Sequence, residues 1–322
     1  MKILQNKINN MRRLFLLLIC IVLINVASTQ VLFPFSGDYS SYLSHYSGSG
    51  GERFEPLYKG LVLIFNYILG YSEASFLFFM VVVSSITLFG KAYVSYRINP
   101  ASLVFFCLIY LIYFYLLHEA NQVRVSIGLS FSIVSIYFLS KDNYLKYLFL
   151  MFIAIGFHYS MALFLMAFFV HKGVKKNRIK LMYLVIVLST VLIHFLLDYG
   201  ILGKINPLIN TYLDFNLEYK FNPFYLTLLL LLGYLGAANN LPYFGRLMYH
   251  LFIFLIIVAL SIRFIPILSV RIMDLVNVVG LFFVASTRFS LKLKPFFLYL
   301  TMASIAIPRF YIFVTTDTIY NF

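Results

Sequence analysis

The amino-acid sequence predicts an all-α, polytopic integral membrane protein, and three observations support this fold class. Of the 322 residues, 62% are hydrophobic and only 11% are charged, whereas a soluble domain carries about 25% charged residues. Apolar runs close to the roughly 20 residues that cross a bilayer recur along the chain. The alternating segments of about 10 residues that are typical of a transmembrane β-barrel are absent from the sequence.

The apolar runs predict the individual helices. The first run follows four basic residues, so we expect an uncleaved helix that leaves the N-terminus in the cytoplasm. A signal peptide cleaved near "NVAST" is the alternative. The runs lie at 14–33, 57–70, 74–95, 101–117, 123–139, 144–157, 159–171, 180–197, 223–238, 247–262, 267–287 and 295–314.

The basic residues predict how the helices are oriented. If 57–70 crossed the membrane, the basic run "HKGVKKNRIK" would lie outside, against the usual excess of Lys and Arg in cytoplasmic loops. We therefore expect about 11 spans plus a re-entrant or outer-surface helix near 57–70. This topology places 17 of the 25 basic residues on the cytoplasmic side, Lys91 among them. The short runs 144–157 and 159–171 are expected to form a tight hairpin with its tip at "FHYS".

The same topology predicts one transmembrane domain over 1–322. Its long outer loops lie near 34–57 and 198–222, and a basic cytoplasmic loop lies at 171–180. The outer loops combine Tyr and Asn with carboxylates, a composition that suits carbohydrate but is common in outer loops. The net charge of +14 is interpreted through its location, so that the basic loop contacts anionic lipid rather than nucleic acid.

The basic residues that break the orientation bias indicate a site. Arg124 begins one span within "EANQVRVSIGLS", and Arg271 begins another, where an ion pair with Asp274 is the alternative interpretation. Two guanidinium groups at the outer leaflet match a pyrophosphate, because guanidinium binds phosphate oxygens bidentately. The residues that break the bias are Arg53, Lys59, Arg124, Lys204, Lys220, Arg263, Arg271 and Arg309.

One histidine interrupts an apolar run at a predicted outward turn. His158 in "FHYSMA" either caps a helix break or belongs to the site, because an unpaired polar group is costly within a membrane. Ser160, two residues later, is placed to cap the returning helix.

Several short motifs occur in a fixed order along the chain. Together they resemble the EpsG/Wzy-type family of bacterial polysaccharide polymerases. The chain departs from that family's pattern at Val125, where Gln is frequent, and at Met161, where Ala is frequent. The matching residues are Asp38-Tyr39 with Tyr42, then Glu55 with Tyr58, Gln122-Val123-Arg124, His158-Tyr159-Ser160 and finally Arg271.

The resemblance implies a glycosyltransferase of the bacterial inner (cytoplasmic) membrane, with a glycosyltransferase-C-like arrangement and a site facing outward. Such an enzyme joins oligosaccharide repeat units carried on undecaprenyl pyrophosphate, beside membrane lipid and with chain-length regulator and flippase proteins as partners. A flippase, an O-antigen ligase-like transferase and a structural subunit that organises other enzymes are the alternative functions.

This chemistry assigns expected roles. Arg124 and Arg271, with Arg263 and His158 in reserve, stabilise the leaving pyrophosphate. Asp38 is the first candidate for general base, and Glu55 is the second. No D-x-D motif and no His/Cys cluster with metal spacing occurs in the sequence, so no metal cofactor is expected; a metal held by scattered carboxylates is the alternative. The residues expected to bind substrate are Tyr39, Tyr42, Tyr58, Gln122, Ser160 and Arg263.

Overall fold

The computed structural model describes residues 17–28, 38–48, 54–180, 183–184, 188, 223–237, 241–263, 265–287 and 293–315. These residues contain helices and no strand. The chain divides into two compact units, one of residues 1–165 with 309–321 and one of residues 166–308 with Phe322, and each unit is described by itself.

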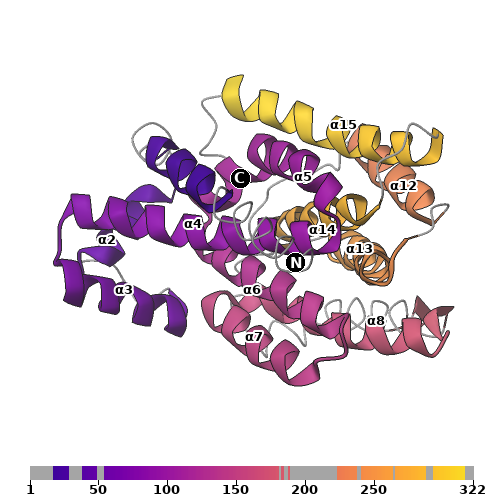
Figure 1. Ribbon diagram of the computed structural model, residues 1–322, viewed down its shortest axis with the longest axis horizontal. Coiled ribbons are helices and arrows are strands. Elements are labelled where there is room, and N and C mark those ends of the chain that lie inside the picture. The colour runs from indigo at the N-terminus through magenta and orange to yellow at the C-terminus, as the bar shows by residue number, and fades with distance from the viewer. Residues whose placement is uncertain are drawn as a thin grey trace, which may run out of the picture. The chain divides into compact units, whose positions relative to one another are not determined.

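The first unit is built around α6, which packs against α4 on one side and α7 on another (Figure 1). Helix α3 packs against α7, and the π-helix η3 continues from α5. The elements are a helix at Leu17–Ser28, then α2 (Tyr39–Tyr46), α3 (Pro56–Leu69), α4 (Glu73–Ile98), η2 (Pro100–Ser102), α5 (Leu103–Ile109), η3 (Tyr110–Asn121), α6 (Val123–Leu139), α7 (Tyr144–Phe157) and η4 (Tyr159–Leu165).

The second unit has the antiparallel pair α13 and α14 at its centre. Helix α8 packs against α13, and α12 packs against both members of the pair. The elements are α8 (Met166–Lys175), α12 (Pro223–Ala237), α13 (Tyr243–Ser261), α14 (Pro266–Ser286) and α15 (Leu293–Thr315).

The helices confirm the predicted all-α membrane class. Three of them, at Glu73–Ile98, Tyr243–Ser261 and Leu268–Ser286, are long and apolar enough to cross a membrane. Shorter apolar helices include 56–69, 123–139 and 144–157, which match the predicted runs to within a residue. The total of about 11 spans stays a prediction. Most of the run 180–197 and the outer loop 198–222 lie outside the described residues.

Local chemistry explains where the central helices begin. Ser72 accepts a hydrogen bond from the backbone N–H of Ser75 at 3.0 Å, and the Ser75 hydroxyl accepts one from the backbone N–H of Ser72. This reciprocal cap satisfies backbone donors at the start of α4. Asn143 caps α7 in a similar way by accepting from the N–H of Lys146.

The predicted hairpin between α7 and the following segment is present. His158 has an extended backbone conformation after α7, and the chain then returns along that helix. The Tyr147 hydroxyl, near the start of α7, donates to the carbonyls of Phe164 and Leu165 at 3.2 Å. The turn therefore holds His158 at one end of the first unit.

One basic residue of the predicted cytoplasmic set, Lys91, is buried in the structure. The charge count places Lys91 on the cytoplasmic side, yet the structure buries its side chain completely within the first unit, paired with Glu119 at 2.7 Å. A buried, neutralised lysine carries no information about which loop faces the cytoplasm. The membrane side of Lys91 stays a prediction, and its side chain can be buried because the carboxylate of Glu119 lies within reach of its ammonium.

Candidate active site

Three ionisable side chains, Glu55, Arg124 and His158, converge in the first unit and together are called the Glu55 group. Glu55 uses one carboxylate oxygen, Oε2, to contact Nη1 of Arg124 at 2.5 Å. Its other oxygen, Oε1, lies 2.7 Å from Nδ1 of His158. The three residues come from separate parts of the sequence, so only the tertiary fold assembles this group.

Each member of the group sits at the end of a helix. Glu55 has an extended conformation just before α3, whose first residue is Pro56. Gln122 separates η3 from α6 and has a non-helical conformation, which places Arg124 in the first turn of α6. His158 ends α7. A side chain at the end of a helix is not held within the packed face of that helix. The three side chains can therefore reach one another.

A glycine allows the helix that carries His158 to approach Arg124. Gly128 lies one turn after Arg124 on α6, where residues four apart share a face. A Cβ built at Gly128 would lie 2.7 Å from Cγ of Met161, 3.1 Å from the carbonyl oxygen of Ala154 and 3.4 Å from Cβ of His158. Any larger residue would push the end of α7 away from α6.

The charges around Glu55 favour its ionised form. Burial alone would raise the pKa of Glu55, but the hydrogen bond from His158 and the positive charge of Arg124 help to outweigh burial and lower that pKa below its usual value. A carboxylate can only accept a hydrogen bond, so Nδ1 of His158 carries the proton that it shares with Glu55. In the neutral imidazole, Nε2 is then the atom with a free lone pair.

Aromatic rings cover part of the Arg124 guanidinium. Its Cζ lies 4.6 Å from the ring centre of Phe54, and its Nε donates to the Tyr42 hydroxyl at 3.5 Å. The ring of His45 stacks on Phe54 at 4.1 Å. Glu55 and Tyr42 use two of the five guanidinium N–H groups, and 23% of the Arg124 side chain remains exposed. The guanidinium can therefore bind a further anion.

Asp38 lies at the edge of this group. Its backbone N–H donates to Oδ1 of Asn121, the last residue of η3, at 3.0 Å. It immediately precedes α2, and its negative charge acts on Tyr42, the same tyrosine that contacts Arg124. The chain segment that carries Asp38 is thus anchored next to the start of α6.

The predicted substrate-binding tyrosines differ in their environment. The Tyr39 hydroxyl donates to Oε1 of Glu73 at 3.0 Å; burial, this hydrogen bond and the charge of Glu73 raise the pKa of Tyr39 to about 12. Tyr42 and Tyr58 are only 2% and 0% exposed and belong to the apolar core shared by α2, α3, α4 and α6. Their rings pack the site from behind, so in this conformation they present no face on which a sugar could stack.

The remaining predicted site residues are divided between the two units. Gln122 shapes the break before α6, and Ser160 lies in η4 with its side chain partly exposed. Arg263 and Arg271 belong to the second unit, in the turn after α13 and in the first turns of α14, and both side chains are exposed. Asp274, the predicted partner of Arg271, is buried.

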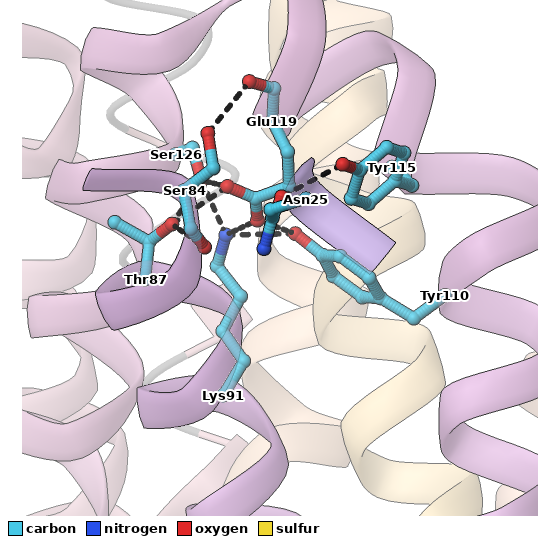
Figure 2. A network of polar contacts seen from close by, with 8 residues as sticks. All are labelled: Asn25, Ser84, Thr87, Lys91, Tyr110, Tyr115, Glu119 and Ser126. Carbon is cyan, nitrogen blue, oxygen red and sulfur yellow. Dashed lines mark hydrogen bonds and ion pairs between the residues drawn. The ribbon is translucent and has the colours of Figure 1, made fainter. Parts of the chain in front are cut away.

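The structure also contains a polar cluster that the sequence analysis missed. Lys91 donates to Glu119, Tyr110 and Ser126, each at 2.7 Å (Figure 2). The side chains of Lys91 and Glu119 are fully buried. A lysine within a long apolar run, and a glutamate shortly before the next break, formed the signal that could have revealed the pair.

The described residues offer no group of three or more His, Cys, Asp or Glu side chains that could hold a metal ion. Within the first unit, the guanidinium of Arg124 and the imidazole of His158 both contact Glu55 and both stay partly exposed, so they are candidates to bind an anion at this carboxylate.

Comparison with known proteins identifies the family. No curated protein and no solved structure matches the chain. The EpsG family matches residues 13–322, which is nearly the whole chain and includes every residue of the Glu55 group. The chain therefore belongs to the EpsG family, as its motifs predict, and is a membrane protein of polysaccharide biosynthesis.

Proposed function

We propose that the protein is a glycosyltransferase that polymerises oligosaccharide repeat units carried on undecaprenyl pyrophosphate. The observation that carries this proposal is one carboxylate, Glu55, that holds an arginine and a histidine which both remain partly exposed. Such a group offers a fixed cation for a phosphate and an oriented imidazole for a proton. Membership in the EpsG family supports the reaction class.

The reaction needs two functions at one place. A hydroxyl oxygen of the acceptor sugar attacks the anomeric carbon of the donor, and the bond between that carbon and the pyrophosphate oxygen breaks. The bonding electrons leave with undecaprenyl pyrophosphate, and the hydroxyl proton is transferred to the protein. Arg124 stabilises the negative charge that develops on the pyrophosphate, since a fixed cation requires little reorganisation during the reaction.

His158 is the residue that we assign to proton transfer. Glu55 fixes the proton on Nδ1, so Nε2 is free to accept the hydroxyl proton, and the carboxylate stabilises the imidazolium that results. Glu55 itself makes a poor base, because both of its oxygens are engaged and its pKa is lowered by its partners despite burial. Glu55 is thus better assigned to orienting His158 than to the base role expected from the sequence.

Asp38, which the sequence makes the first candidate for the base, is the second candidate after His158 in this proposal. It lies beside Tyr42 and is anchored to Asn121, close to the Arg124 end of the group. Arg271 and Arg263 remain candidates for a second contact to the pyrophosphate, because both are exposed cations, Arg263 in the turn after α13 and Arg271 near the start of α14.

The proposal includes a location. Glu55, Arg124 and His158 would face the outer side of the bacterial inner membrane, with the N-terminus in the cytoplasm. There the enzyme would meet lipid-linked repeat units delivered by a flippase and would act beside a chain-length regulator.

The test uses the purified protein in nanodiscs with its lipid-linked repeat unit and a chelator throughout. Wild type should produce a ladder of products, and Arg124→Ala should abolish it while the protein stays folded. Asp38→Asn separates the two base candidates: a retained ladder supports His158, and a lost ladder supports Asp38. Wild type that produces a single transfer product would indicate a ligase, and movement of the lipid-linked unit across the bilayer without a ladder would indicate a flippase.

A further inference from the structure

We propose that the buried pair Lys91–Glu119 is a positioning element that holds Arg124 and the Asp38 segment in place. The inference rests on the proposed function for its catalytic consequence, although its structural part can be tested separately. Neither residue contacts the Glu55 group directly, so any effect must pass through the backbone of η3 and α6.

The hydrogen bonds around Glu119 form a complete set. Oε1 accepts from Lys91 at 2.7 Å and from Tyr110 at 2.8 Å. Oε2 accepts from Thr87 at 2.6 Å and from Ser126 at 2.5 Å. The three ammonium hydrogens of Lys91 point to Glu119, Tyr110 and Ser126 (Figure 2). A buried ionic network is favourable only when its members are satisfied in this way.

This set joins three helices at one level. Lys91 and Thr87 belong to α4, Tyr110 and Glu119 to η3, and Ser126 to α6. The Ser84 hydroxyl of α4 also donates to the backbone carbonyl of Glu119 at 3.1 Å. The last turn of η3 is therefore fixed to α4 through both its side chain and its backbone.

A second set of contacts fixes the same π-helix to the helix at Leu17–Ser28. The Tyr115 hydroxyl donates to Oδ1 of Asn25 at 2.7 Å (Figure 2). Nδ2 of Asn25 donates to the Ser85 hydroxyl at 3.2 Å. A π-helix has poorer backbone hydrogen-bond geometry than an α-helix and is rare beyond one turn. Side-chain contacts to two neighbours explain how a π-helix as long as η3 persists.

The network adjoins the candidate site on both sides of the break at Gln122. Asn121, two residues after Glu119, accepts the hydrogen bond from the backbone of Asp38. Arg124 lies two residues before Ser126, in the same first turn of α6. A shift of the η3 end would thus move the Asp38 segment and Arg124 together. A misplacement of about 1 Å can cost roughly 100-fold in rate.

The alternative is that the pair merely neutralises two buried charges. The variant Lys91→Met/Glu119→Gln separates the two roles, because it removes both charges together and leaves no unpaired ion. Glu119→Asp is a second variant that distinguishes positioning from charge neutralisation. It keeps both charges but shortens the side chain that carries the carboxylate by one methylene. Ser95→Ala is the matched control. The Ser95 hydroxyl is buried one turn after Lys91 on α4 and has no hydrogen-bond partner among the described residues.

The experiment measures backbone hydrogen exchange and polymerisation kinetics on the full-length protein in nanodiscs. In the double variant we expect faster exchange in the segments 38–48 and 119–126, with unchanged exchange in 243–261. We expect kcat to fall about 10- to 100-fold with KM within about twofold of wild type, because Arg124 acts on charge that develops in the transition state. Ser95→Ala should match wild type in both measurements.

Each outcome decides the inference. Wild-type exchange and wild-type kcat in the double variant would show that the pair only neutralises charge and would overturn the proposal. If the double variant does not fold, Glu119→Asp gives the same decision by the same two measurements. If wild type forms no product ladder, the proposed function fails on its own, and the exchange at 38–48 and 119–126 still decides whether the pair positions these segments.

Discussion

The first unit contains two carboxylate–cation groups that have the same chemistry and different surroundings. Around Glu119, the carboxylate and the lysine are both 0% exposed, and every contact is internal. Around Glu55, the arginine is 23% exposed and the histidine 14% exposed. The group of Lys91 and Glu119 is closed, because it has no capacity left for a ligand. The group of Glu55, Arg124 and His158 is open, because it has free guanidinium donors and a free imidazole nitrogen.

The difference indicates how to distinguish, in a membrane protein, ionisable residues that hold helices together from ionisable residues that can bind a substrate. Ionisable residues inside a membrane are costly and are therefore functional candidates by default. Completeness of hydrogen bonding refines that rule, because a fully satisfied network holds helices together while a partly satisfied one is available to a substrate. By this criterion Glu119 and Lys91 support the site, and Glu55, Arg124 and His158 form it.

The largest expected effect comes from breaking the closed group on one side. Lys91→Met leaves the Glu119 carboxylate buried without its cation, and removal of one partner of a buried pair costs about 3–5 kcal/mol. Thermal unfolding in detergent should show a large loss of stability. Arg97→Met on the same helix is the control, because Arg97 is exposed and surface substitutions usually change stability by less than about 0.5 kcal/mol. Equal stability of the two variants would remove the distinction between the groups.

The next effect tests the open group. Arg124→Ala should lower the rate of ladder formation about 100- to 1,000-fold, the range expected for loss of one stabilising donor at developing charge. Arg124→Lys should restore little, since lysine lacks the planar fork that binds phosphate bidentately. Lys146→Ala, at an exposed position on α7, serves as the control. A wild-type rate in Arg124→Ala would contradict the assignment.

A smaller effect concerns the packing that brings α7 to α6. Gly128→Ala would place a Cβ 2.7 Å from Met161 and 3.1 Å from a backbone oxygen, and overpacking of this kind typically costs about 1–3 kcal/mol. Because His158 lies on the displaced segment, activity should fall as well. The control is Gly60→Ala, where nothing lies within 4 Å of the added Cβ. Matching behaviour of the two variants would show that the close approach is not required.

The smallest effect is a pH dependence at Glu55. Its pKa in the folded protein lies below the ordinary value of 4.5, so its ionisation contributes stability that is present above pH 4.5 and is lost as the pH falls through the folded pKa. Unfolding transitions recorded between about pH 3 and pH 6 should show this loss in wild type and a flatter dependence in Glu55→Gln. Identical pH dependence in both proteins would mean that the partners of Glu55 do not favour its charged form.

The sequence predicts most of the described helices because apolar runs have clear ends. Runs 123–139 and 144–157 correspond to α6 and α7 without adjustment. The run that ends at Leu117 does not, because η3 continues through Glu119 to Asn121. A buried glutamate looks like the end of a span until its partner is known, and Lys91 lies 28 residues away in the sequence.

The candidate site could be predicted as a set of residues but not as a geometry. The ordered motifs predict that Glu55, Arg124 and His158 belong to one site. In the structure, Arg124 and His158 both contact Glu55. From sequence alone, Glu55 is the second candidate for the base after Asp38, because the two contacts that occupy its oxygens depend on tertiary packing. Burial of Tyr42 and Tyr58 likewise depends on how α2 and α3 fold over α4, which no local pattern specifies.

The most direct test of the account is the single-turnover rate of His158→Asn with the lipid-linked repeat unit. The asparagine amide can replace Nδ1 as donor to Glu55 but provides nothing at the position of Nε2. The account predicts a folded protein that binds the donor and reacts about 100- to 10,000-fold more slowly than wild type, the range expected for loss of a general base. A wild-type rate would contradict the claim that the Glu55 group carries out the proton transfer.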